Sequence, residues 1–499
     1  MRTSAVIAHR LLHAVGLAVS VVIAVAAFAA SAASTPVLGY DDARHLLART
    51  GFGPTDAEVR AYATLTREAA VAKLLKETQT TASTTPPGGA LDTSPLQFPN
   101  PETSSAEEKA SFAQAQAREG IALRAWWVRE MLTTPSPLTE RMTLFWHNHF
   151  VSSQAKVRFA RLMYRQNVTL RANATGNFGV LLHAMAKDPA MLVYLDGVRS
   201  RKGAPNENFA REVMELFTLG EGHYTEQDVK EAARAFTGWS VDRETGEFMV
   251  RPRLHDSAMK TVFGTSGRFD GDDVLDLLLA RPDTTRHLTE KLWREFVSPH
   301  PDPAAVQRIA ARFAESHYDI KVALSELLLC DAFYAAENRG VLVKSPADLV
   351  VGTLRTLGIE PEQGVAFAVA TAVMGQSLMA PPNVKGWPGG EAWINATTLL
   401  ARKQFVDRVA RADGMSTRSE RMTSTRPAKA GGALERGLSN LHFDSARFMS
   451  QFPGAAPGER AQWAQRLLLP VAPQSTEEPP NDATAIVHGL VLDTAYQLK

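Results

Sequence analysis

The sequence predicts an all-α fold, a large multi-helix bundle-like body with long surface loops. Sustained alternation of apolar and polar residues, which is typical of half-buried strands, is absent from the chain. Helix starts are explicit: Thr225 is followed three residues later by Asp228, an acidic form of the capping box. An apolar pattern with a helical period follows Thr225 and ends at Gly238. A second start is Asp188, which precedes a proline at a first helical position.

The N-terminal segment, residues 1–33, is predicted to be a Sec-type signal peptide. Arg2 and Arg10 precede a long apolar run, and small residues follow that run. An uncleaved anchor is the alternative, because the run approaches the length of a membrane span. No later stretch is apolar enough over about 18 residues to cross a bilayer. We therefore expect an exported protein, periplasmic or extracellular, without a membrane span after cleavage.

The rest of the chain is expected to divide into two parts. Residues 34–412 are predicted to form one helical domain, in which residues 78–105 are a polar loop or linker because Thr, Ser, Pro and Gly dominate there. Helical blocks are expected over 40–76, 106–240 and 270–376. Residues 413–499 are predicted to be a C-terminal extension of loops and short helices.

Composition excludes several classes of protein. Of 499 residues, 45% are hydrophobic and 21% are charged, which is ordinary for a globular chain and excludes wholesale disorder. Lys and Arg number 54 and Asp and Glu 53, so no basic excess points to nucleic acid. The single cysteine, Cys330, rules out an intramolecular disulfide and zinc sites built on several cysteines.

Two histidines lie in the segment Arg141–Phe150. A helix advances about 100° per residue, so His147 and His149 would project roughly 160° apart and could not chelate one ion. The projection places His149 on the face toward the core and His147 on the face pointing away. His149 is therefore either a hydrogen-bonded core histidine or a catalytic or ligand-binding residue.

A candidate helix begins at Asn206, a good N-cap residue. Glu207 and Arg211 stand four residues apart on its polar side, as in a solvated ion-pair ladder. Glu212 lies at the border of the apolar face. A carboxylate there has either a cationic partner or a raised pKa, and both occur in functional sites as well as in structural ion pairs.

His255, Asp256 and Lys260 lie in a segment without clear periodicity. Polar residues with acid–base chemistry on a loop beside a helical body are a better functional signal than the same residues on a helix. The alternative is chance adjacency, because a His-Asp pair alone is a weak motif.

A Pro- and Gly-rich turn over residues 381–391 displays Trp387, and Trp393 follows closely. Tryptophan faces next to Asn, Lys and Glu suit sugars and other amphipathic ligands. The alternative is a packing loop whose tryptophans cover the core.

Six motifs occur in one order over roughly residues 40–410, and together they resemble the bacterial domain-of-unknown-function 1800 family. They are His45–Arg49 with Gly51–Gly53, Leu144–Phe150, Asn206–Gly220, Ala235–Trp239, His255–Asp256 with Lys260–Thr261, and Pro381–Gly390. The resemblance implies an exported, mainly helical protein of unestablished activity, often encoded beside an exported sulfatase- or phosphatase-like protein.

Three functions stay open at this point. The first is an accessory or ligand-binding protein of the cell envelope, acting with a sulfatase-like partner on glycan or other surface material. The second is a hydrolase that uses carboxylate and histidine as general acid and base. The third is a metal- or non-covalent haem-binding protein, although no metal ligand and no cofactor is predicted. Candidate catalytic residues are Glu212, His149, His255 and Asp256; candidate ligand-binding residues are His147, Asn206, Glu207, Arg211, Lys260, Trp387 and Trp393.

Overall fold

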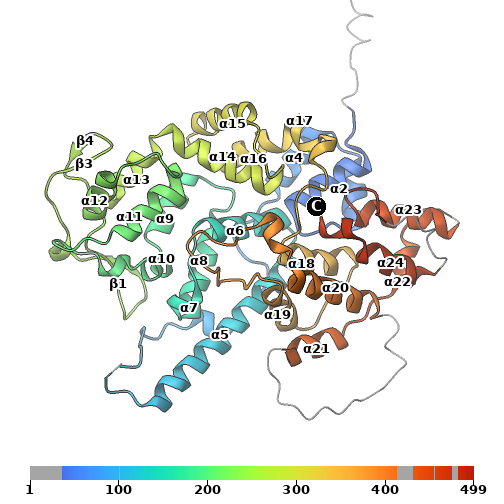
Figure 1. Cartoon of the computed structure of the whole chain (residues 1–499), viewed down its shortest axis with the longest axis horizontal. Coiled ribbons are helices and arrows are strands. Elements are labelled where there is room, and N and C mark those ends of the chain that lie inside the picture. The colour runs from blue at the N-terminus through green and yellow to red at the C-terminus, as the bar shows by residue number, and fades with distance from the viewer. Residues whose placement is uncertain (1–35, 101, 413–430, 455, 475–481) are drawn as a thin grey trace, which may run out of the picture.

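The computed structural model describes the chain except residues 1–35, 101, 413–430, 455 and 475–481 (Figure 1). The predicted signal peptide lies outside the described residues, as do residues 413–430 and 475–481 of the predicted C-terminal extension. The all-α prediction is confirmed, because helices make up the body and the strands among the described residues form only two short hairpins.

The N-terminal half is a succession of helices, with a long helix, α5, reaching out from the body (Figure 1). Their bounds are α2 (Gly39–Thr50), α3 (Asp56–Ala63), α4 (Arg67–Lys76), η1 (Gly88–Leu91), α5 (Ala106–Thr133), α6 (Pro137–His149), α7 (Gln154–Val157), α8 (Ala160–Ala172), α9 (Phe178–Ala186), α10 (Pro189–Tyr194), η2 (Gly197–Arg199), α11 (Glu207–Met214), the π-helix η3 (Glu215–Leu219) and α12 (Glu226–Ala235).

Two antiparallel hairpins follow α12. They are β1 (Trp239–Val241) with β2 (Phe248–Val250), and β3 (Lys260–Val262) with β4 (Thr265–Gly267), with η4 (Pro252–Leu254) between the pairs. Each strand is three residues long, which is too short for an alternating pattern to show in the sequence.

Helices resume after the hairpins. They are α13 (Gly271–Leu279), α14 (Pro282–Phe296), α15 (Pro303–Glu315), α16 (Ile320–Leu329), α17 (Asp331–Tyr334), η5 (Ala336–Asn338), α18 (Pro346–Thr356), α19 (Val365–Val373), η6 (Gly390–Trp393), α20 (Ala396–Ala410), α21 (Gly431–Ser439), α22 (Ser445–Ser450), α23 (Pro457–Leu468), α24 (Ala483–Leu492) and η8 (Thr494–Gln497).

The predicted helix starts are present. Thr225 and Asp228 form a reciprocal capping box at α12, Asp188 accepts the Met191 backbone N–H at α10, and Asn206 caps α11. These side chains satisfy backbone donors that the first turn of a helix leaves unpaired.

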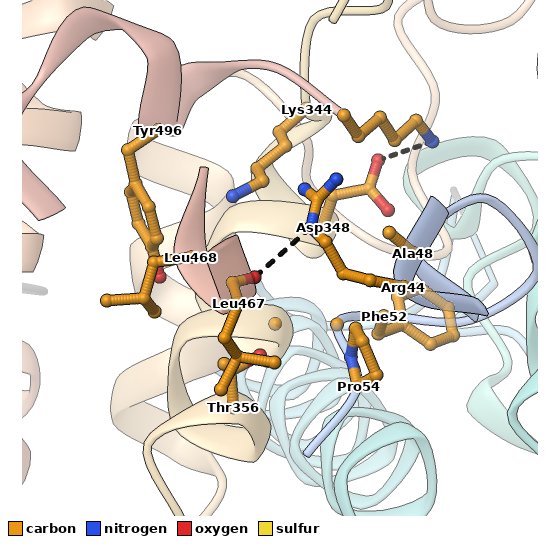
Figure 2. A pocket seen from close by; sticks show the side chains of 13 residues that line it. Arg44, Ala48, Phe52, Pro54, Lys344, Asp348, Thr356, Leu467, Leu468 and Tyr496 are labelled. Atoms are coloured by element: carbon orange, nitrogen blue, oxygen red, sulfur yellow. Dashed lines mark hydrogen bonds and ion pairs between the residues drawn. The ribbon is translucent and has the colours of Figure 1, made fainter. Parts of the chain in front are cut away.

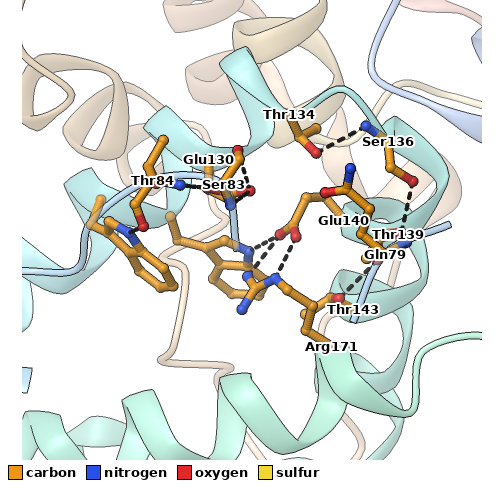
Figure 3. A network of polar contacts seen from close by, with 12 residues as sticks. Gln79, Ser83, Thr84, Glu130, Thr134, Ser136, Thr139, Glu140, Thr143 and Arg171 are labelled. Atoms are coloured by element: carbon orange, nitrogen blue, oxygen red, sulfur yellow. Dashed lines mark hydrogen bonds and ion pairs between the residues drawn. The ribbon is translucent and has the colours of Figure 1, made fainter. Parts of the chain in front are cut away.

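Helix α6 lies in the middle of the body, with α11–α13 on one side and α18–α20 on the other (Figure 1). The side chains of Leu138, Met142 and Trp146 on α6 are almost fully buried, and they belong to one continuous apolar core. Polar residues of α6 are buried as well: Arg171 and Trp127 contact the Glu140 carboxylate (Figure 3). Because α6 is enclosed by other helices, it has no solvent-exposed face, and the histidines that it brings to the candidate site are buried.

The segment 78–105 is a surface loop that is held to α5 by one carboxylate. Glu130 is 1% exposed and accepts the backbone N–H of Ser83 and of Thr84, both at 2.8 Å (Figure 3). The hydroxyl groups of the same two residues also donate to it. Four hydrogen bonds to an ionised group offset the cost of burying it.

Candidate functional site

A cavity of about 390 Å³ lies against the C-terminal half of α6, between α14, the start of α18 and the 385–393 segment. Its lining contains five basic side chains and two acidic ones, namely Arg141, Lys291, Arg294, Lys385 and Lys499 against Glu295 and Asp348. Apolar area comes from Leu144, Phe145 and both tryptophans, Trp387 and Trp393. The cavity therefore combines aromatic faces with an excess of positive charge.

His149 lines this cavity at the end of α6. Its Nε2 donates to the Phe217 carbonyl at 3.1 Å, and its Nδ1 has no hydrogen-bond partner among the described residues. Burial, then the charge of Lys291, holds the pKa of the ring far below its usual value. The ring is therefore neutral at pH 7, and its Nδ1 is a buried hydrogen-bond acceptor.

The expected orientation of His147 was wrong. Rather than facing away from the core, His147 is 1% exposed, and its ring centroid lies 5.5 Å from that of Trp127 and 5.7 Å from that of Trp387. Burial lowers its pKa to about 4. The projection of α6 assumed one solvent face, whereas both faces are covered.

Lys291 approaches the same place from α14. The residue is partly exposed as a whole, but burial of its ammonium group, followed by the charge of Arg294, lowers its pKa to about 8. Its ammonium group donates to the Leu216 carbonyl at 3.3 Å. No carboxylate in the described part of the chain forms an ion pair with it.

The π-helix η3 supplies the carbonyl groups that receive these side chains. Carbonyls at the end of a helix lack partners within the helix, so they are free to accept from outside. The Phe217 carbonyl accepts a hydrogen bond from His149. The Leu216 carbonyl accepts hydrogen bonds from Lys291 and, at 3.4 Å, from His287. This turn joins α11 to the cavity wall.

Asn148 positions the tryptophan loop. Its Oδ1 accepts the Trp387 backbone N–H at 2.7 Å. Gly386 has φ +82°, and a Cβ there would lie 2.3 Å from Asn148 Oδ1, so the loop can approach α6 this closely only with glycine. Trp387 and Trp393 are 4% and 6% exposed, so each both covers the core and lines the cavity. The two predicted alternatives for these tryptophans are compatible in this structure.

A group of buried charges forms one wall. Arg141 pairs with Asp348, and Asp348 Oδ2 accepts from Lys499 Nζ at 3.0 Å and from the Ser345 N–H at 2.9 Å. Burial pushes the pKa of Asp348 up, but the charges of Arg141 and Lys499 hold it far below its usual range. Arg141 also contacts Glu295 at 3.3 Å.

A second hollow of about 30 Å³ adjoins Asp348. Figure 2 shows Arg44, Lys344 and Asp348 converging on it, and Arg44 Nε donates to the Leu467 carbonyl at 3.2 Å. Burial, then Arg44, lowers the pKa of Lys344 to about 7. Its size suits about one water molecule, so the larger cavity is the candidate ligand site.

Glu212 is half-buried on α11 and does not line the cavity. Burial, then Glu215, raises the pKa of its carboxyl, and the charges of Arg211 and Lys385 oppose this shift. No described residue donates a hydrogen bond to it. Of these charges, only Lys385 belongs to a residue that lines the cavity.

The other predicted residues of α11 stabilise its first turns. Asn206 Nδ2 donates to the Asp196 carbonyl at 2.8 Å, and its Oδ1 accepts the Asn208 N–H. Arg211 makes two hydrogen bonds of 2.7 Å to Glu226 and lies 3.8 Å from Glu207. These contacts are those of a surface ion-pair group.

His255, Asp256 and Lys260 form a separate group beside α12. His255 Nδ1 donates to the Thr237 carbonyl at 2.9 Å, and Asp256 accepts from Arg234 Nε at 2.8 Å. The bond from Arg234 lowers the pKa of Asp256 to about 2. Lys260 Nζ donates to the Asp256 carbonyl. None of the three lines the cavity, so the structure does not bring His255 together with His149.

A family model described as "Protein of unknown function (DUF1800)" matches residues 45–497. The chain belongs to the DUF1800 family. No curated protein and no solved structure matches the chain significantly.

The DUF1800 match extends through the segment after 413, where the resemblance in the sequence stopped. That segment completes the site: Tyr496 shares a hydrogen bond of 2.9 Å with Thr353 of α18, the Lys344 N–H donates to the Gln497 carbonyl, and Lys499 reaches the cavity. These residues have no motif of their own, because their role depends on packing against α18 and α20.

Four residues line the cavity of this DUF1800 chain although the sequence alone did not predict them as site residues: Asn148, Lys291, Arg294 and Lys385. Lys291 had a signal: it lies three residues after Leu288, at the edge of the apolar face of α14, where a lysine is unusual. Asn148 and Lys385 stood within the quoted motifs without being assigned a role.

The described residues contain no group of three or more His, Cys, Asp or Glu residues that could hold a metal ion. Within the same residues, every helix is too short or too polar to be a candidate membrane span.

Proposed function

We propose that this DUF1800 protein is an exported ligand-binding protein of the cell envelope that holds an acidic glycan in the cavity beside α6. The observation that carries the proposal is a cavity lined by two tryptophans and by a lysine, Lys291, that forms no ion pair with a described carboxylate. Sugar rings pack their apolar faces on tryptophan, and a carboxylate or sulfate group supplies the missing negative charge.

The burial of Lys291 is the electrostatic argument for an anion. A desolvated ammonium group is unfavourable without a partner, and its lowered pKa measures that cost. Lys385 and Arg294 at the rim add to the positive potential, which attracts anions before they enter. The volume of about 390 Å³ falls within the range of small-molecule sites, roughly 300–1,000 Å³.

His149 adds a neutral acceptor to the cationic site. Its Nδ1, which is buried and has no partner among the described residues, would accept a hydrogen bond from a ligand hydroxyl group, whereas the five basic side chains can only donate. A ligand with both acidic groups and hydroxyl groups therefore satisfies the lining better than a simple anion does.

The proposal includes export and a partner. The leader at residues 1–33 supports export, and the family resemblance supports an exported sulfatase- or phosphatase-like partner. A protein that retains sulfated or phosphorylated glycan would hold the substrate of such an enzyme.

The test is calorimetric titration with a sulfated disaccharide, a uronic-acid disaccharide and the uncharged parent disaccharide. We expect saturable binding of the acidic sugars and at least tenfold weaker binding of the neutral one. Lys291→Met should weaken acidic-sugar binding about tenfold, and Lys230→Met, a change of an exposed lysine on α12, should not alter it. Equal affinity for all three sugars, or no loss in Lys291→Met, would contradict the proposal.

Hydrolysis is the second candidate function, and the raised pKa of Glu212, whose carboxyl also feels the charge of the cavity residue Lys385, favours it. A raised pKa increases the share of protonated carboxyl, which is the form that acts as a general acid. Glu212→Gln should then abolish product formation from a bound glycan while the melting temperature is unchanged. Intact glycan after incubation with the wild-type protein would contradict hydrolysis and leave ligand binding as the proposed function.

A further inference from the structure

Two loops meet on the surface beside β1, outside the cavity. The Ser200 carbonyl accepts from the Gly238 N–H at 3.0 Å, and the Gly238 carbonyl accepts from the Arg251 N–H at 2.7 Å. A third bond joins the Lys202 N–H to the Leu254 carbonyl at 2.7 Å. The segments 197–204 and 250–255 are therefore fixed side by side, with Gly238 between them. We call them the basic loop surface.

This surface carries positive charge only. Residues 197–204 contain Arg199, Arg201 and Lys202, residues 250–255 contain Arg251 and Arg253, and neither segment contains an aspartate or a glutamate. All five of these side chains are exposed. Among the described residues, only Arg199 has an ion-pair partner, Asp196 at 3.8 Å. Five like charges over fourteen residues contrast with a net charge of +1 for the whole chain.

The flanking acids do not neutralise this charge. Asp196 is held by Lys156 at 2.6 Å, and Asp256 is held by Arg234 at 2.8 Å. Each carboxylate therefore has its nearer partner outside the surface, and Arg199 is the one basic residue of the surface that shares one of them. The other four basic side chains keep their full positive charge toward solvent.

Three large apolar side chains are exposed on and next to the same loops. Val250 is 46% exposed, Leu254 37% and Met259 56%. Leu254 immediately follows Arg253, and Val250 immediately precedes Arg251, so apolar and basic residues are neighbours in this loop. Such groups gain free energy when they leave water, provided that the partner offers an apolar phase.

We propose that the basic loop surface binds the face of an anionic phospholipid bilayer. Arginine and lysine side chains pair with lipid phosphates, and groups of such residues beside apolar side chains are the usual basis of peripheral membrane binding. Val250, Leu254 and Met259 insert among the headgroups. An acidic polysaccharide offers the same charges but no apolar phase, so it leaves the exposed apolar residues unexplained.

The surface is held rigidly to the rest of the molecule. Asn206, the N-cap of α11, makes two hydrogen bonds that attach the loop to this helix. Its backbone N–H donates to Ser200 Oγ at 3.1 Å, and its side-chain amide donates to the Asp196 carbonyl. Binding at the loops would therefore present a fixed face of the protein to the bilayer. This inference does not depend on the ligand of the cavity.

The test is flotation of the purified protein with vesicles of phosphatidylcholine alone or with 30% phosphatidylglycerol. We expect binding to the anionic vesicles, little binding to the neutral ones, and a loss of binding as salt rises. The fourfold variant Arg201→Gln, Lys202→Gln, Arg251→Gln, Arg253→Gln should bind at least tenfold more weakly. Its matched control removes four exposed charges from other helices: Lys76→Gln, Arg118→Gln, Arg308→Gln, Arg408→Gln. The control should bind as the wild type does.

A second variant separates insertion from simple attraction. Leu254→Ser with Met259→Ser keeps every charge and should weaken vesicle binding severalfold, most visibly at high salt, where attraction is screened. Lys291→Met should leave vesicle binding unchanged, so failure of the cavity proposal and failure of this one are distinguishable. Equal binding of the fourfold variant and its control would overturn the inference. So would retention of the protein by an acidic polysaccharide but not by anionic vesicles, or its loss from vesicles through self-association at this surface.

Discussion

Arg171 and Glu140 form a two-point ion pair in the centre of the body, and each side chain is 1% exposed. Arg171 Nε lies 2.5 Å from Glu140 Oε1, and Arg171 Nη2 lies 2.9 Å from Glu140 Oε2. Trp127 Nε1 donates to the same carboxylate at 2.8 Å. Three donors around one buried acid tie α5, α6 and α8 together, and α6 carries the histidines of the candidate site.

Glu140→Gln should destabilise the protein by about 3–5 kcal/mol, because it leaves the buried Arg171 without a counter-charge. Urea unfolding followed by circular dichroism measures the change. Glu226→Gln, which breaks an exposed pair with Arg211, is the control and should leave the midpoint unchanged. Equal losses of stability in the two variants would show that burial does not determine the cost of breaking an ion pair.

Glu130→Ala should release the loop over residues 78–105, since it removes four hydrogen bonds to Ser83 and Thr84. Limited digestion with proteinase K, read by mass spectrometry, should give cuts in this loop many times faster than in the wild type. A stability loss of about 1.5–3 kcal/mol should accompany it. Glu107→Ala, an exposed change on the same helix, should digest like the wild type.

Stability should fall as the pH drops below about 6.5, because four histidines with lowered pKa values, His45, His147, His149 and His287, resist protonation in the folded chain. Burial lowers the pKa of His45 to about 2 and those of His147 and His287 to about 4. Below pH 6.5 the unfolded chain takes up protons that the folded chain does not, so each histidine lowers the unfolding free energy by up to about 1.4 kcal/mol per pH unit.

Urea unfolding at pH 7.5 and at pH 5.0 measures this dependence. His147→Leu should reduce the difference in unfolding free energy between the two pH values by the contribution of one histidine. His442→Gln, a change of an exposed histidine, should preserve the difference. An unchanged difference in His147→Leu would mean that His147 takes up a proton in the folded state.

Lys291→Met should stabilise the ligand-free protein by roughly 1–3 kcal/mol at pH 7, since it removes a desolvated charge that has no carboxylate partner. The pKa of Lys291 is about 8 in the folded chain and 10.5 is its ordinary value. Between these values the unfolded state holds the extra proton, so wild-type stability should rise with pH there. Thermal unfolding at pH 7, 8.5 and 10 should show this rise in the wild type and in Lys230→Met, and a smaller rise in Lys291→Met.

Local chemistry made much of the fold predictable. Thr225 with Asp228, Asp188 before a proline, and Asn206 each announce a helix start by a bond within three residues of the chain, and all three starts are present. The two hairpins escaped prediction because each strand has three residues and its pairing lies outside any local pattern.

The site depended on contacts between distant segments. A projection of α6 could place His147 and His149 on opposite faces, but it could not show that both faces are covered. Lys291 lies 142 residues beyond His149, and the Phe217 and Leu216 carbonyls that receive them belong to a third helix. Helix capping and helical period are short-range properties that depend on neighbouring residues. The burial of the histidines, the unpaired charge of Lys291 and the shared cavity arise only when the helices pack.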